Sequence, residues 1–172
     1  TDYIDVLLLH RPSPLMDPKE IAKAFDQLKS QGKVKSFGVS NFTASQMSLL
    51  SSENLIEWNQ IECSLTQSNS MFDDTLNYMS INQIGAMAWS PLGSYFKEDN
   101  NQNKRIKPLL SKMCSTYNAS EDQILLAWLL HHPANIHPVV GTTQKERLKD
   151  AVDALSIKLK IQDWFLLLEA SW

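Results

Sequence analysis

Four short apolar segments recur along the chain at nearly regular intervals, and this regularity constrains the fold more than any other feature. The segments are centred near residues 7, 37, 61 and 87. Each interval has the length of one strand, one helix and their connecting loops, which predicts parallel strands joined by right-handed crossover helices. The spacing alone is compatible with a doubly wound sheet and with a (β/α)8 barrel.

Local signals set the boundaries of the expected elements. Strands are predicted over residues 5–10, 34–40, 58–63, 84–89 and, very short, 138–141. Helices are predicted over residues 17–32, 43–50, 73–81, 107–117, 120–132, 144–155 and 162–172. The first helix begins with Asp17 as the N-cap and Pro18 in the first turn, and Thr43 caps the second. Ser120 followed by Gln123 forms a capping box. The polar segment 90–107 has the composition of a solvated loop.

Composition excludes several classes of protein. The chain has 172 residues, of which 43% are hydrophobic and 20% charged, as in a globular protein with one domain. A net charge of −3 without a basic patch argues against nucleic acid as a partner. No apolar run reaches the length of a membrane span, and the polar opening TDYID is unlike a signal peptide.

A cytoplasmic location is therefore expected, with Cys63 and Cys114 as reduced thiols. No metal site is expected, because His131, His132 and His137 fall at a helix end and in a loop.

Polar and aromatic side chains follow every predicted strand. They are His10 after the first strand, Ser40 and Asn41 after the second, Gln60 near the end of the third, Trp89 to Ser94 after the fourth, and Gly141 to Thr143 after the fifth. In a parallel barrel the carboxyl ends of all strands meet at one rim, where active sites are built. A single polar residue at such a position is usually only a helix cap, but five successive ends exceed what capping requires.

The chemistry of these side chains favours a nicotinamide dinucleotide as the ligand. The amides of Asn41 and Gln60 can pair with a primary carboxamide, and the indole of Trp89 can stack on a ring. Arg147 can clamp a terminal phosphate. Glycines and hydroxyls that allow close approach to phosphates are Gly93, Ser94, Gly141, Thr142 and Thr143. The chain has no G-x-G-x-x-G and no G-x-x-x-x-G-K motif, the usual marks of Rossmann and P-loop sites.

Five motifs, in this order and spacing, resemble the aldo-keto reductases, in particular bacterial oxidoreductases of the YdhF type. They are IDVLLLHRP from residue 4, GKVKSFGVSNF from 32, NQIECS from 59, AWSPLGS from 88 and GTTQKER from 141. The resemblance covers essentially the whole chain. It implies a (β/α)8 barrel that binds NADP(H) and reduces a small aldehyde or ketone to an alcohol by hydride transfer.

The resemblance also implies roles for individual residues. His10 resembles the active-site histidine that orients the substrate carbonyl. The cofactor-binding residues implied are Ser40, Asn41 and Gln60 for the carboxamide, Trp89 for the nicotinamide ring, Ser90, Leu92 and Ser94 for the pyrophosphate, Gly141, Thr142, Thr143 and Arg147 for the 2′-phosphate, and Asp150 near the adenine. Gly141 stands where many members have a lysine, which leaves the preference for NADPH over NADH open.

The catalytic tetrad of the family also contains an aspartate, a tyrosine and a lysine from the first three βα units, which precede the histidine. Here the histidine is residue 10. We therefore expect residues 1–172 to be the C-terminal portion of one barrel domain, namely its fourth to eighth βα units.

Without the tyrosine, this chain alone would lack the general acid and be inactive. Exposed barrel edges would then favour self-association. Residues 94–106 are either a cofactor clasp or a disordered insertion. The alternative function is that of a non-catalytic nucleotide-binding or assembly module.

Overall fold

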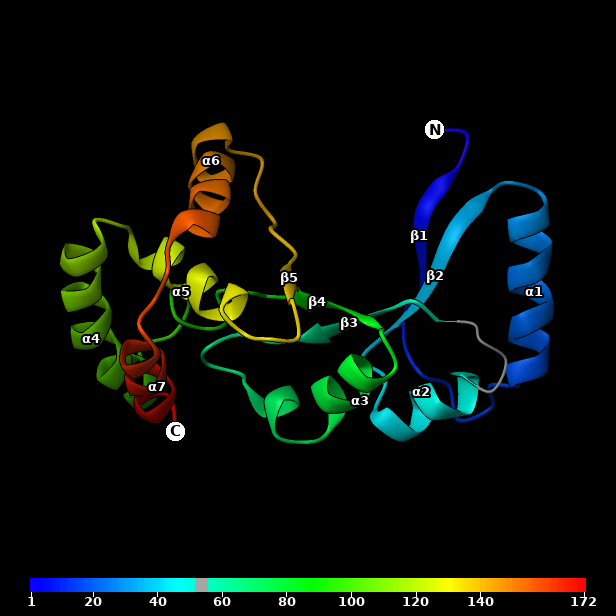
Figure 1. Ribbon diagram of the computed structural model, residues 1–172, viewed down its shortest axis with the longest axis horizontal. Coiled ribbons are helices and arrows are strands. Elements are labelled where there is room, and N and C mark those ends of the chain that lie inside the picture. The colour runs from blue at the N-terminus through cyan, green and yellow to red at the C-terminus, as the bar shows by residue number, and fades with distance from the viewer. Residues whose placement is uncertain (52–55) are drawn as a thin grey trace. The chain divides into compact units, whose positions relative to one another are not determined.

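The computed structural model describes residues 1–51 and 56–172, shown in Figure 1. The chain forms two compact units. The first comprises Thr1–Ile61 and Ser70–Met87, and the second comprises Glu62–Asn69 and Ala88–Trp172. Each predicted site residue lies within one of these units.

Five strands of the described residues form a sheet in the order of the sequence: β1 (Ile4–Leu9), β2 (Val34–Ser40), β3 (Trp58–Glu62), β4 (Gly85–Trp89) and β5 (His137–Pro138). The pairs β1–β2 and β2–β3 are parallel. The sequence order of neighbouring strands confirms the βα repeat that the apolar spacing predicts.

The fifth strand is shorter than predicted, since residues 139–141 lie outside it. The N–H of Val139 still donates to the carbonyl oxygen of Ala88 at 2.8 Å. Pro138 has no N–H for a ladder. The chain therefore leaves the sheet early, and Val139 and Val140 are each 40% exposed.

Helices α1 (Pro18–Ser30), α2 (Ala44–Ser51) and α3 (Thr75–Ile81) belong to the first unit. The predicted caps of the first two helices are confirmed. The side chain of Asp17 accepts a hydrogen bond from the N–H of Lys19 at 2.8 Å. The hydroxyl of Thr43 accepts from the N–H of Gln46, whose side-chain oxygen accepts from the N–H of Thr43 in return.

The core of the first unit joins α1 to the sheet. The rings of Phe25 on α1 and Phe37 on β2 stack with their centroids 3.9 Å apart, and Val34 is buried beside them. The buried amide of Asn59 on β3 donates to the carbonyl oxygen of Phe42 at 3.0 Å. That bond ties the segment after β2 to the first half of β3.

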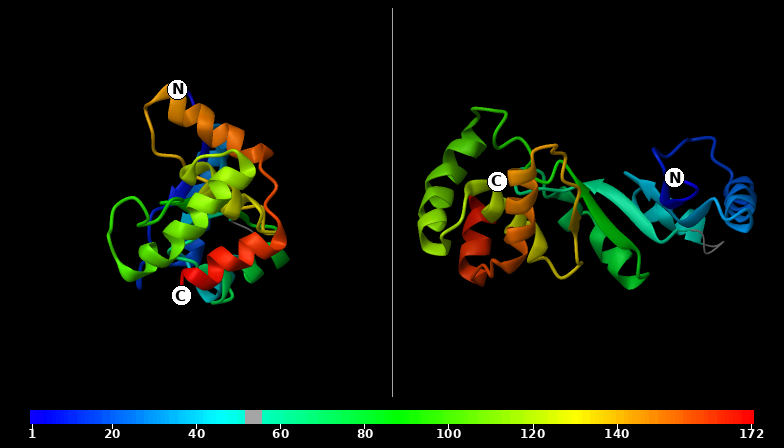
Figure 2. Two further views of the ribbon diagram at one scale, coloured as in Figure 1. Left: turned by 90° about the vertical axis from the view of Figure 1, so that its left-hand side faces the viewer. Right: turned by 90° about the horizontal axis from the view of Figure 1, so that it is seen from above.

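The second unit contains the helices α4 (Asn101–Tyr117), α5 (Glu121–Leu130), α6 (Lys145–Asp153) and α7 (Ile161–Ala170). Their colours run from green for α4 to red for α7 in Figures 1 and 2. Residues 124–129 of α5 are all buried, which explains the apolar character of that helix. The indoles of Trp128 on α5 and Trp164 on α7 stack with centroids 4.8 Å apart. Each indole N–H donates to the other residue's carbonyl oxygen, at 3.1 and 2.9 Å.

The prediction of a loop over residues 90–107 is wrong in its second half, because α4 begins at Asn101. The side-chain oxygen of Asn100 caps the helix by accepting from the N–H of Asn103 at 2.8 Å. Pro108 lies inside this helix. The alternative of a disordered insertion over 94–106 is also wrong, since the N–H groups of Lys97 and Glu98 donate to the carbonyl oxygen of Ser94 and α4 begins at Asn101.

Smaller differences concern helix ends. The helices predicted over 120–132 and 162–172 end at Leu130 and Ala170. The helix predicted over 144–155 ends at Asp153 and continues as a 3-10 turn, Ala154–Ser156. Cys63 and Cys114 form no disulfide. Among residues 1–51 and 56–172, no helix is both long and apolar enough to cross a bilayer, and no group of three or more acidic, histidine or cysteine side chains could hold a metal.

Candidate functional site

The carboxyl end of β2 lies beside the middle of β3, which brings Ser40, Asn41 and Gln60 into contact. Gln60 is the central residue of β3, not near its end as predicted. The hydroxyl of Ser40 and the backbone N–H of Asn41 both donate to the carbonyl oxygen of Gln60, at 3.1 and 2.9 Å. The side-chain amide of Asn41 donates to the hydroxyl of Ser40 at 3.2 Å. Asn41 has a φ of 59°, in the left-handed region that asparagine tolerates better than most residues. The structure therefore gathers the three residues expected to bind a carboxamide.

His10 directly follows β1, which pairs with β2 so that Leu9 lies opposite Val39. Its side chain is exposed and lines a cavity of about 360 Å³ in the first unit. Arg11, Asp17 and Phe42 line the same cavity. The imidazole is accessible at the end of a parallel strand, where it can donate to or accept from a substrate oxygen.

A second cavity, of about 320 Å³, lies within the second unit. Five of the predicted cofactor-binding residues line it: Ser90, Leu92, Gly141, Thr142 and Arg147. They come from the turn after β4, from the segment after β5 and from α6. Residues separated by some fifty positions in the sequence thus share one cavity, as a common binding site requires.

The turn after β4 has an unusual backbone. Ser90 and Gly93 both have positive φ values, 49° and 58°. The N–H of Gly93 donates to the carbonyl oxygen of Ser90 at 2.8 Å, and the N–H of Ser94 donates to the hydroxyl of Thr66 at 3.0 Å. These bonds shape residues 90–94, of which 90–93 line the cavity. The segment 90–94 is called the phosphate loop below, after the role proposed for it in the next subsection.

Charge in the cavity comes from two cations and one carboxylate. Lys97 and Arg147 supply the positive charges, and Asp122 from the first turn of α5 supplies the negative one. Val139 and Val140 add apolar surface. Ligand sites typically combine apolar walls with a few placed polar groups. This cavity can bind an anion at its cationic side chains and an apolar ring against the valines.

Sequence reasoning missed Lys97, Asp122 and the two valines. Lys97 lies in the segment predicted to be a solvated loop, and the valines in a segment predicted to be a strand. Asp122 occupies the first turn of α5, where an acidic residue is expected for helix stability alone. An available signal was the basic side chain of Lys97 only three residues after the motif AWSPLGS.

Four other predicted residues, Trp89, Ser94, Thr143 and Asp150, are absent from the lining of this cavity. Trp89 is half-buried and directly precedes Ser90. The backbone N–H of Ser94 is already bound to Thr66. Their roles in binding stay predictions.

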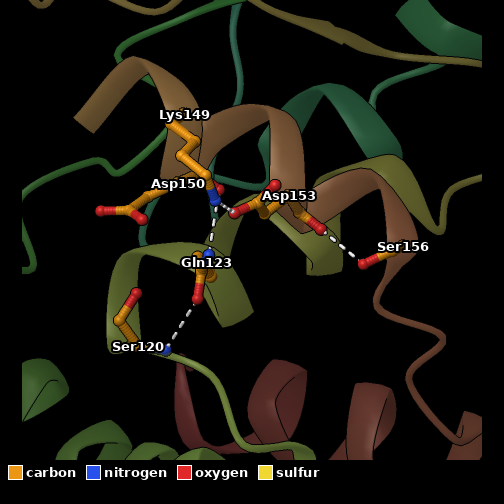
Figure 3. Close-up of polar contacts among 6 residues, drawn as sticks. All are labelled: Ser120, Gln123, Lys149, Asp150, Asp153 and Ser156. Atoms are coloured by element: carbon orange, nitrogen blue, oxygen red, sulfur yellow. Dashed lines mark hydrogen bonds and ion pairs between the residues drawn. The ribbon is translucent and has the colours of Figure 1, made fainter. Parts of the chain in front are cut away.

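Asp150 contributes to the position of α6 through its backbone. Its carbonyl oxygen accepts a hydrogen bond from the side-chain amide of Gln123 at 3.2 Å, while its carboxylate points away from this contact (Figure 3). The side-chain oxygen of Gln123 accepts from the N–H of Ser120 at 3.0 Å, as the capping box predicts. The cap of α5 therefore also holds α6, the helix that carries Arg147.

The chain belongs to the aldo/keto reductase family, whose family model matches residues 1–170. The uncharacterized oxidoreductase YcsN of Bacillus subtilis is 45% identical over 99% of this chain and 58% of its own length. A 6-dehydroglucose reductase of Agrobacterium fabrum is 41% identical, with 96% and 56% covered. The oxidoreductase YdhF of Escherichia coli is 37% identical, with 99% and 58% covered. The chain thus spans somewhat more than half the length of these relatives.

Solved structures give the same result for the fold. The thermostable aldo-keto reductase Tm1743, solved with the inhibitor epalrestat, superposes with a TM-score of 0.88 at 27% identity, over 99% of this chain and 61% of that one. An aldo/keto reductase from Klebsiella pneumoniae, solved with NADP and acetate, superposes with a TM-score of 0.85 at 24% identity, over 97% and 58%. The predicted family and the fold class of a partial (β/α)8 barrel are confirmed.

Proposed function

We propose that this chain is the nucleotide-binding portion of an NADP(H)-dependent reductase of aldehydes or ketones, and that the 320 Å³ cavity binds the phosphate-bearing part of NADP(H). The observation that carries the proposal is the meeting of Lys97 and Arg147 with the phosphate loop and Thr142 at one cavity. The family membership and the NADP complex of the Klebsiella pneumoniae structure support it.

Two cations at this cavity favour a phosphorylated ribose. Gly141 stands where many family members have a lysine, so this position carries no charge here. Lys97 lines the same cavity as Gly141. We assign to Lys97 the charge that position 141 lacks, beside Arg147, which is suited to bind a phosphate through two parallel hydrogen bonds. NADPH is therefore the preferred cofactor in this proposal.

In the first unit, the amides of Asn41 and Gln60 are proposed to bind the carboxamide of the nicotinamide, with Ser40 supporting Asn41 through the bond between their side chains. Bound NADPH would supply the hydride for reduction of the carbonyl. His10 would donate a hydrogen bond to the carbonyl oxygen of the substrate and so orient it.

The alkoxide formed by hydride transfer needs a proton, and two tyrosines of the second unit are poorly suited to supply it. The hydroxyl of Tyr95 donates to Glu121 at 3.0 Å, and burial together with that bond raises the pKa of Tyr95. The hydroxyl of Tyr117 donates to Asp163, and burial likewise raises its pKa. A good general acid has a pKa near the working pH. We propose that residues 1–172, expected to be the fourth to eighth βα units of the barrel, bind the cofactor without turning it over.

Titration of the protein with NADP⁺ and NAD⁺, followed by tryptophan fluorescence, tests the cofactor proposal. NADP⁺ is expected to bind about tenfold more tightly than NAD⁺, which corresponds to about 1.4 kcal/mol. Lys97→Met should remove most of this preference, whereas the exposed Lys112→Met, away from the cavity, should keep it. Equal affinity for both nucleotides in the wild-type protein would contradict the assignment of Lys97.

Addition of a reactive aldehyde to the NADPH complex then tests turnover. Unchanged absorbance of the reduced nicotinamide supports a binding portion that lacks the general acid. Oxidation of NADPH would show that an acid is present and would contradict that part of the proposal. Binding without turnover in a protein that carries the complete tetrad would instead favour the non-catalytic module.

We further propose that β1 supports self-association, because it is the first strand of the sheet and pairs only with β2 in the described residues. Tyr3 and Ile4 are 42% and 44% exposed there. Edge strands with exposed apolar side chains pair readily with other chains. Sedimentation velocity should show a mass that rises with protein concentration; a monomer at all concentrations would contradict the proposal.

A further inference from the structure

The phosphate loop has two faces, and the cavity occupies only one of them. Ser90, Leu92 and Gly93 line the cavity, whereas Thr66 does not. Thr66 follows β3 and contacts the loop through its hydroxyl. We propose that Thr66 is a positioning residue that holds the phosphate loop in the shape required for binding NADP(H), an inference that rests on the proposed function.

The first observation is the hydrogen bond between the two segments. The hydroxyl oxygen of Thr66 accepts from the backbone N–H of Ser94 at 3.0 Å, across 28 residues of sequence. This N–H therefore serves to hold the loop, and it is not available to a phosphate. The backbone N–H of Ser94 can therefore contribute to binding only indirectly, through Thr66.

The second observation is the close approach of Gly93 to the same side chain. A Cβ on Gly93 would collide with the hydroxyl oxygen of Thr66 and would lie 2.5 Å from that of Ser64. Only glycine, which has no Cβ, therefore fits beside these two hydroxyls. The hydroxyl of Thr66 thus limits how far the loop can move away from the cavity.

The third observation is that Thr66 is itself held firmly. Ser64 and Gln67 flank it and exchange backbone hydrogen bonds at 3.0 and 3.2 Å, which close a tight turn. The side-chain amide of Gln102 on α4 donates to the carbonyl oxygen of Thr66 at 3.3 Å and also to that of Ser171. The turn is therefore tied both to α4 and to the chain after α7.

These contacts hold the loop in one shape before a ligand arrives. A preformed binding loop raises affinity because less conformational freedom is lost on binding. Loss of the Thr66 hydroxyl should therefore weaken nucleotide binding even though the side chain lies outside the lining of the cavity.

The test compares three variants of the protein. Thr66→Val removes the acceptor and keeps the branched shape, and Thr66→Ser keeps the hydroxyl. Thr116→Val is the matched control, because it removes a threonine hydroxyl that donates to the carbonyl oxygen of Lys112 on the exposed face of α4. Two quantities are measured, the dissociation constant of NADP⁺ and the hydrogen-exchange rate of the Ser94 amide without nucleotide.

Thr66→Val should weaken NADP⁺ binding about five- to tenfold and speed exchange of the Ser94 amide about tenfold, as expected for the loss of one hydrogen bond. Thr66→Ser should restore both values to within about twofold of the wild-type protein, and Thr116→Val should change neither. Unchanged thermal unfolding of Thr66→Val would show that the effect is local.

Two results would overturn the inference. Wild-type affinity in Thr66→Val would refute it while leaving the proposed function intact. Faster exchange in Thr66→Val together with no binding of NADP⁺ by the wild-type protein would refute the proposed function and reduce Thr66 to a structural residue.

Discussion

Gly93→Ala tests the shape of the phosphate loop most directly, because it adds a single methyl group at its tightest point. The added Cβ would meet Thr66 and Ser64 at distances that real side chains do not adopt. The φ of 58° also places alanine in the left-handed region. The substitution therefore combines backbone strain with overpacking.

The two costs can be estimated separately. The left-handed conformation costs an L-residue about 1–2 kcal/mol, and an extra methyl in a packed site costs about 1–3 kcal/mol. Gly93→Ala should therefore lower the free energy of unfolding by about 2–5 kcal/mol.

Two other glycines serve as controls. Gly32 has a φ of 66° and nothing within 4 Å of an added Cβ, so Gly32→Ala should cost only the strain of about 1–2 kcal/mol. Gly141 has no positive φ and nothing within 4 Å of an added Cβ, so Gly141→Ala should be neutral or raise the free energy of unfolding by up to about 1 kcal/mol.

Urea unfolding followed by tryptophan fluorescence measures all three variants. The expected order of destabilisation is Gly93→Ala, then Gly32→Ala, then Gly141→Ala. The NADP⁺ affinity of Gly93→Ala should fall as well, because the loop must move to accept the methyl group. A loss of stability no larger than that of Gly32→Ala would refute the close contact with Thr66 and with it the shape of the loop.

Three further predictions concern the core and the pH dependence of stability. Trp128→Leu should lower the free energy of unfolding by about 3–5 kcal/mol, because it leaves a cavity and breaks both hydrogen bonds with Trp164; chemical denaturation checks this, and a loss below about 1 kcal/mol would contradict it. Burial and the bond to Glu121 raise the pKa of Tyr95 above its ordinary 10.0, so above this pH the folded state keeps a proton that the unfolded state loses. The free energy of unfolding should therefore fall as pH rises above about 10, and Tyr95→Phe should make this fall shallower in thermal unfolding curves. Burial lowers the pKa of His132 below its ordinary 6.5, so the unfolded state binds a proton more readily than the folded state. The free energy of unfolding should therefore decrease as pH falls below 6.5. His132→Gln should make this decrease shallower in thermal unfolding curves, and an unchanged decrease would contradict the role of the imidazole.

Local patterns in the sequence were sufficient for much of the fold. The strand spacing predicts the parallel sheet, and the caps at Asp17, Thr43 and Ser120 lie where their side-chain chemistry places them. These features depend on residues within a few positions of one another, so they can be identified without knowledge of the tertiary structure. The start of α4 was missed because its asparagines also suit a loop, and the decisive contacts of Asn103 run to the backbone of Ser94 and Glu98.

Some residues of the candidate site could likewise be identified from the sequence, and others only from the tertiary structure. Glycines, hydroxyls and a basic residue after strands are recognisable in the sequence and pointed to Thr142 and Arg147, and the family resemblance added Ser90. Only the tertiary structure brought these residues to one cavity, added Lys97 to it and placed Thr66 behind its wall. Such contacts join positions 28 or more residues apart, and they depend on how turns and helices pack, which no local pattern of residues encodes.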